Sequence, residues 1–126
     1  MKKKEIPKLL RIWFIIHFIT DMIFAIPLLF FSTWTLNLFG FPLENLLFVR
    51  IVGAALIGIG GASLFNYKKE KASYEIMLTL KIIWSLTAIL AIIWSIIEGA
   101  PKITWLFLAI FIGFSIVWQY YKVKLR

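Results

Sequence analysis

The 126-residue chain contains no cysteine and only one histidine, His17. The absence of cysteine excludes disulfide bonds, thiolate metal sites and cysteine nucleophiles. One imidazole without thiolates does not make a typical zinc site, so the sequence predicts no metal centre and no cofactor. There is also no recognisable serine–histidine–acid set, and no carboxylate cluster suited to two-metal phosphoryl transfer. The sequence therefore does not favour an enzyme.

Charge is also scarce. Charged residues make up 16% of the chain, whereas 62% of it is hydrophobic. Soluble domains contain roughly 45–50% apolar residues, and a chain this short could not cover so much apolar surface within one core. The sequence therefore predicts an integral membrane protein whose main partner is the lipid bilayer.

The net charge of +8 could suggest a nucleic-acid-binding protein, but the positions of the basic residues argue against it. Lysines and arginines lie in short clusters at the ends of apolar stretches, where such clusters set the orientation of a membrane protein. Anionic lipid headgroups are the simpler partner, and we expect no nucleic acid.

Four apolar stretches are each long enough to cross the hydrocarbon layer, which takes about 20 helical residues. They cover about residues 9–31, 46–67, 74–97 and 103–121. The connections between the last three stretches are short, and short connections favour antiparallel neighbours. The sequence predicts an all-α fold, a single four-helix transmembrane bundle of up-down-up-down topology that covers residues 1–126.

The connection between the first two stretches, residues 32–45, is longer and unusually apolar. It contains Trp34, Leu36, Leu38 and Phe39, which would be poorly accommodated in water. We expect a segment that lies in the membrane interface, as a short amphipathic helix that stops at Gly40.

The distribution of basic residues predicts the orientation of the chain. Most of the 14 lysines and arginines belong to three clusters that lie before the first helix, between the second and third, and after the fourth. Positive charge is enriched on the cytoplasmic side, so we expect a multi-pass protein of the cell membrane with both termini in the cytoplasm. The three clusters are Lys2, Lys3, Lys4, Lys8 and Arg11; Lys68, Lys69 and Lys71; and Lys122, Lys124 and Arg126.

Four ionisable residues within the apolar stretches are the candidate site residues: His17, Asp21, Arg50 and Lys81. An ionisable group inside the membrane is costly and needs a partner. His17 and Asp21 are four residues apart and share one helix face. From their depths we predict a buried polar layer in which Asp21 meets Arg50 and His17 lies near Lys81.

This polar layer has two interpretations. It could form a ligand or proton site inside the bundle. Alternatively, it could be a structural ion pair that fixes the helix register, with Lys81 extending along the helix to the headgroups.

The second apolar stretch is rich in small residues. Ala54, Gly58 and Ala62 are spaced by four, and Gly53 and Gly61 widen the same face. Small side chains allow close approach of a neighbouring helix. The face could pack inside the bundle, or it could contact a second copy of the chain.

Two motifs resemble the DoxX-like class of small four-helix membrane proteins. The first is Leu38-Phe39-Gly40-Phe41-Pro42, and the second is Arg50-x-x-Gly53 followed by small residues up to Gly60. The resemblance covers mainly residues 36–65. It implies a four-helix bundle, and it implies no established chemistry.

These observations leave two functions open. The chain could be a structural or accessory protein, a partner or subunit within the membrane. Alternatively, it could be a small-molecule or lipid binder or carrier that uses a buried site of Asp21, His17 and Arg50. The sequence names neither the ligand, nor the partner, nor the oligomeric state.

Overall fold

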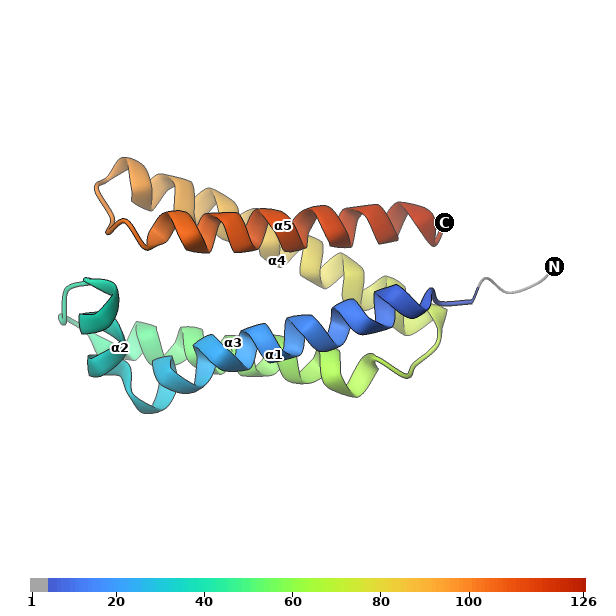
Figure 1. The fold of residues 1–126 in the computed structure, drawn as a ribbon, viewed down its shortest axis with the longest axis horizontal. Coiled ribbons are helices and arrows are strands. Elements are labelled where there is room, and N and C mark those ends of the chain that lie inside the picture. The colour runs from blue at the N-terminus through green and yellow to red at the C-terminus, as the bar shows by residue number, and fades with distance from the viewer. Residues whose placement is uncertain (1–4) are drawn as a thin grey trace. The chain divides into compact units, whose positions relative to one another are not determined.

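The computed structural model describes residues 5–126, so that Lys2, Lys3 and Lys4 of the first basic cluster lie outside the described residues. Within residues 5–126 the regular secondary structure is helical (Figure 1). The helices are α1 (Lys8–Phe30), α2 (Ser32–Phe39), α3 (Leu46–Asn66), α4 (Lys71–Ile97) and α5 (Thr104–Lys124).

The predicted all-α fold with four membrane-length helices is confirmed. Helices α1, α3, α4 and α5 are all long and apolar enough to cross a membrane. The largest differences from the predicted bounds are the start of α4 at Lys71 and the end of α5 at Lys124. Lysines in the last turn of a helix interact favourably with its macrodipole, so α5 continues beyond the residue where its apolar character ends.

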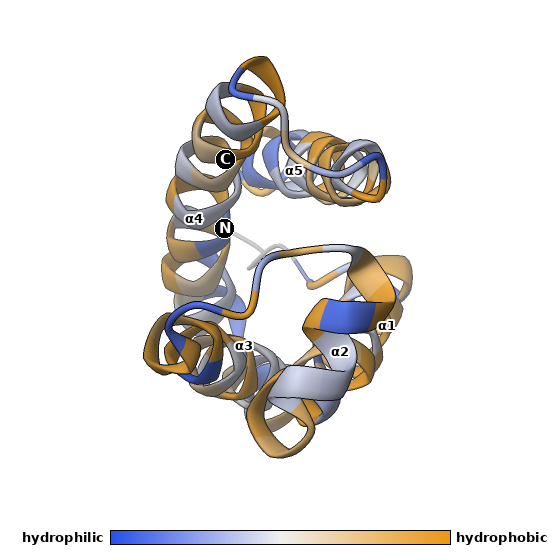
Figure 2. Ribbon diagram, turned by 90° about the vertical axis from the view of Figure 1, so that its left-hand side faces the viewer, coloured by the Kyte–Doolittle hydropathy of each residue, from blue (hydrophilic) through white to orange (hydrophobic). Residues whose placement is uncertain are grey.

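Apolar residues occur around the long helices rather than in one stripe (Figure 2). In the most apolar window of each of the four helices, only 22% of the residues are buried. Large side chains such as Ile23, Phe65 and Leu90 are at least 63% exposed. Apolar surface of this extent requires lipid rather than water around it.

The chain divides into two compact units. One consists of residues 11–68 and contains nearly all of α1, with α2 and α3; we call it the N-terminal hairpin. The other consists of residues 69–126 together with residues 5–10; its helices α4 and α5 form what we call the C-terminal hairpin.

In the N-terminal hairpin, α1 and α3 are antiparallel neighbours. At one end, the guanidinium of Arg11 donates a hydrogen bond to the carbonyl oxygen of Tyr67. Further along, Gly60 lies against Asp21, and Gly53 lies against Leu29. Residue numbers thus rise along α1 as they fall along α3.

The short helix α2 lies between these two helices in the chain and confirms the predicted helix that stops at Gly40. Gly40 adopts the left-handed conformation with φ 84°. Its N–H donates to the carbonyl of Asn37 at 3.2 Å, and the N–H of Phe41 donates to that of Leu36 at 2.9 Å. This pair of bonds is a Schellman motif, and glycine is favoured at its left-handed position because it has no side chain to clash there.

Helix α3 begins with a side-chain cap. Asn45 is extended, and its Oδ1 accepts a hydrogen bond from the N–H of Leu47 at 2.9 Å. Such a cap satisfies one of the N–H groups that have no partner within the helix. It explains why α3 begins at Leu46, directly after the cap residue.

In the C-terminal hairpin, α4 and α5 are also antiparallel. The ammonium of Lys122 donates to the carbonyl oxygen of Glu75 at 3.1 Å. Towards the other end of the hairpin, the ring of Phe111 packs edge-on against Trp84 with centroids 6.0 Å apart. The connection turns at Gly99, whose φ is 93°, and this position also favours glycine.

Candidate functional site

The buried face of α1 carries two of the four predicted site residues. His17 and Asp21 are only 4% and 6% exposed. They belong to a series of buried positions spaced by three or four residues, the spacing of one helix face. The series is Leu10, Phe14, His17, Asp21 and Ala25.

The structure brings His17 and Asp21 together. The imidazole Nε2 of His17 lies 3.3 Å from the carboxylate Oδ2 of Asp21. Because the two residues are one helical turn apart, the backbone of α1 alone fixes this pair. A buried carboxylate needs hydrogen-bond donors or a positive partner, and a neighbouring imidazole can supply either.

The backbone of α3 closes one side of this pair. A methyl group added at Gly60 would lie 2.8 Å from Cβ of Asp21 and 3.1 Å from its Oδ2. Real Cβ atoms essentially never approach to 2.8 Å. The carboxylate is therefore packed directly on α3 at this point, and no ligand group fits between Asp21 and Gly60.

The face of α3 that packs in this way includes Gly53 of the predicted face, but it differs from the predicted stripe of Ala54, Gly58 and Ala62. Its buried positions are Gly53, Leu56, Gly60 and Ser63. In the predicted stripe, Ala54 and Gly58 are exposed, and a methyl group added at Gly58 would meet nothing within 4 Å. A spacing of four also drifts around a helix of 3.6 residues per turn, whereas alternating steps of three and four stay on one face.

The structure does not bring Arg50 to Asp21, and this predicted pairing is corrected. Arg50 is exposed. It also precedes Gly60, the α3 residue beside Asp21, by ten residues, which amounts to about 15 Å along the helix axis. The buried polar pair of the N-terminal hairpin thus consists of His17 and Asp21, while Arg50 stands apart near the start of α3.

Lys81 belongs to the C-terminal hairpin and is completely buried, with 0% exposure. The sequence left open that the side chain of Lys81 extends along its helix to the lipid headgroups, but the structure instead buries this side chain inside the hairpin. Its ammonium lies 4.9 Å from the ring centroid of Trp118 on α5. A cation over the face of an aromatic ring is attracted by the ring quadrupole, most strongly for tryptophan.

Trp118 is itself held firmly in place. Its ring stacks on that of Phe114, with centroids 5.6 Å apart and planes 14° from parallel, and it is only 1% exposed. This partner of Lys81 was not predicted from the sequence. A lysine and a tryptophan on consecutive antiparallel stretches were a usable signal, but their register could not be fixed from apolar runs alone.

His17 and Lys81 belong to different units, so their predicted proximity stays a prediction. Within residues 5–126 there is no group of three or more histidine, cysteine, aspartate or glutamate side chains that could hold a metal ion.

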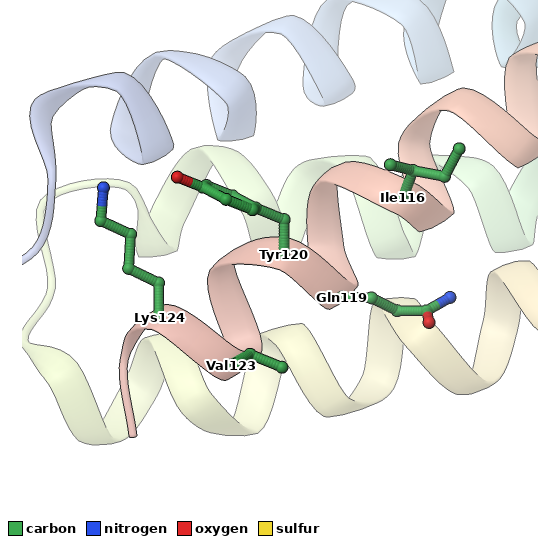
Figure 3. A pocket seen from close by; sticks show the side chains of 5 residues that line it. All are labelled: Ile116, Gln119, Tyr120, Val123 and Lys124. Atoms are coloured by element: carbon green, nitrogen blue, oxygen red, sulfur yellow. The ribbon is translucent and has the colours of Figure 1, made fainter.

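An open depression lies elsewhere, along the last turns of α5 (Figure 3). It contains none of the predicted site residues.

Comparisons with protein-family models, with curated proteins and with solved structures gave no match.

Proposed function

We propose that this small membrane protein has a structural or accessory role, as a partner or subunit of a larger assembly in the cell membrane. The observation that supports this proposal most directly is the contact of Asp21 with Gly60. A site that binds and releases a ligand at Asp21 needs open space beside the carboxylate, whereas α3 occupies one side of it. Packing of this kind favours a role in fixing the register of α1 on α3.

The alternative is a binder or carrier built on His17, Asp21 and Arg50. The exposure of Arg50 and its distance from Gly60 count against these three residues as one buried site. We therefore favour the structural role for the His17–Asp21 pair.

We propose that both termini lie in the cytoplasm. In support, each hairpin has one strongly basic end. Arg11 and Lys68 lie at the end of the N-terminal hairpin where Arg11 meets Tyr67. Lys71 and Lys122 lie at the end of the C-terminal hairpin where Lys122 meets Glu75. Positive charge of this kind is retained on the cytoplasmic side.

We further propose that α2 lies in the opposite, outer interface. Its exposed positions include Trp34 at 60% and Leu38 at 64%, and the preceding Phe31 is 61% exposed. The polar side chains of Ser32 and Thr35 are buried and donate to carbonyl oxygens of Leu28 and Phe31. A short helix with apolar residues outward suits the boundary between headgroups and acyl chains.

The relationship to DoxX-like proteins also remains a proposal. It rests on the motif at residues 38–42 and on Arg50-x-x-Gly53. In support, two of the motif glycines have a structural use here, because Gly40 ends α2 and Gly53 allows α3 to approach α1.

The test is native mass spectrometry of the protein extracted gently from its own membrane, with wild type compared to Asp21→Asn. We expect a protein partner that both forms retain, and no small bound mass that the substitution removes. The control is Glu44→Gln, which neutralises an exposed carboxylate. A reproducible small bound mass that Asp21→Asn loses and Glu44→Gln keeps would instead establish the binder.

A further inference from the structure

The last turns of α5 carry a surface depression that none of the roles above uses. It is lined by Ile116, Gln119, Tyr120, Val123 and Lys124 (Figure 3). These residues form two neighbouring rows on the helix, because their spacing is three or four. Tyr120 and Lys124 extend in the same direction in Figure 3, so the polar tips of both lie on one side of the depression.

The lining changes in character along the helix. Ile116 and Val123 are 63% and 66% exposed and present aliphatic surface. Towards the end of α5, the ammonium of Lys124 lies 5.6 Å from the ring centroid of Tyr120. The depression thus combines an apolar wall with a phenol and a positive charge at the end of a membrane-length helix.

The charges that α5 itself contributes near this end have a single sign, whereas carboxylates at this end of the hairpin, such as that of Glu75, belong to α4. Lys122 and Arg126 lie within two residues of Lys124, and no acidic residue occurs in α5 or after it. Tyrosine and lysine at a helix end are typical of headgroup level, where the aromatic ring and the alkyl stem remain in an apolar environment. The side chains that line this end therefore favour a ligand with an anionic group and an apolar remainder.

We propose that this depression binds an anionic phospholipid of the leaflet that surrounds the last turn of α5. The acyl chain lies against Ile116 and Val123, and the phosphate lies at the ammonium of Lys124, with the phenol of Tyr120 as a hydrogen-bond donor. This assignment does not depend on the accessory role, because it concerns only the surface of α5.

The test is lipid titration of the purified full chain, followed by native mass spectrometry, with phosphatidylglycerol and phosphatidylcholine of identical acyl chains. We expect the wild type to bind phosphatidylglycerol more tightly than phosphatidylcholine. Lys124→Gln should weaken it about fivefold, since a basic residue near an anionic lipid surface contributes about 1 kcal/mol. The matched control is Lys102→Gln, which removes the same charge from an exposed position at the other end of the hairpin and should bind like wild type.

A second pair of variants tests the apolar wall. Val123→Trp fills the depression and should weaken phosphatidylglycerol binding, whereas Ile112→Trp, on the same helix outside the depression, should not. Both positions are exposed, so neither substitution disturbs a buried contact. Equal affinity for the two lipids would overturn the proposal, and so would equal losses in Lys124→Gln and Lys102→Gln.

Discussion

The two hairpins accommodate a buried ionisable side chain in different ways. In the N-terminal hairpin, Asp21 has His17 one turn away and the bare backbone of Gly60 opposite. In the C-terminal hairpin, Lys81 lies over the ring of Trp118, one of the largest side chains available. In the N-terminal hairpin the two helix backbones lie close together, whereas in the C-terminal hairpin aromatic rings fill the space between the helices.

The difference follows from the chemistry of the two groups. A carboxylate is short and accepts hydrogen bonds from donors close to it. Because glycine has no side chain, α3 approaches α1 closely at Gly60, and the carboxylate of Asp21 stays inside the hairpin. An ammonium on a long stem is attracted to the face of an aromatic ring, which also covers the stem. The N-terminal hairpin should therefore be sensitive to added volume, and the C-terminal hairpin to lost volume.

The largest effect is expected from Trp118→Ala. Truncation of a fully buried tryptophan typically costs about 3–5 kcal/mol of unfolding free energy. Reversible unfolding in mixed detergent micelles measures this loss. Trp105→Ala provides the control because Trp105 is 60% exposed, and its substitution should have a much smaller effect.

The cation–π contact in the C-terminal hairpin is expected to contribute part of that loss. Lys81→Met keeps an unbranched side chain of similar length and removes its charge. In a double-mutant cycle with Trp118→Leu, we expect a coupling free energy of about 2 kcal/mol, because both side chains are shielded from solvent. Trp94→Leu, at an exposed position several turns further along α4, should show little coupling to Lys81→Met. Equal coupling for the two tryptophans would mean that the contact with Lys81 is not specific.

Added volume is expected to damage the N-terminal hairpin by about 1–3 kcal/mol, the usual cost of overpacking. Gly60→Ala forces a methyl group onto Asp21, so unfolding of this variant should require less denaturant. In Gly58→Ala the methyl group meets nothing within 4 Å, and alanine is the better helix former. Gly58→Ala should therefore be as stable as wild type or more so. A loss of stability in both variants would contradict the assigned packing face.

The smallest effect is expected at the start of α3. Asn45→Ala removes the side chain that accepts from Leu47, and loss of such a cap costs about 1 kcal/mol. Asn37→Ala in α2 removes an exposed side chain of the same type and serves as the control. Thermal unfolding of the two variants in one detergent compares them directly.

The sequence predicted the helices better than the contacts between them. Apolar runs located the four long helices because the bilayer sets their length. Gly40 was recognised as the end of α2 because few other residues adopt its conformation. Arg50 was misplaced because depth estimates locate a residue along the membrane normal and say nothing about the direction in which its side chain points.

The packing glycines show the same limit. Gly58 and Gly60 are indistinguishable by composition, yet only Gly60 has a neighbour that an added methyl group would strike. The choice between them depends on the rotation of α3 about its axis, and apolar residues on every side of a membrane helix leave that rotation undetermined. The contact of Lys81 with Trp118 was missed for the same reason.

The central claim is that the His17–Asp21 pair is closed off by packing, and cysteine labelling in intact membranes tests it most directly. Because the chain has no cysteine, each introduced thiol is the only one. Ser63→Cys is a conservative change at a position with 0% exposure, on the same face of α3 as Gly60, and Glu70→Cys is the exposed control. A water-soluble maleimide is predicted to label Glu70→Cys from one side of the membrane and to leave Ser63→Cys unlabelled from either side. Rapid labelling of Ser63→Cys would reveal a water-filled cavity beside the pair and would contradict the account.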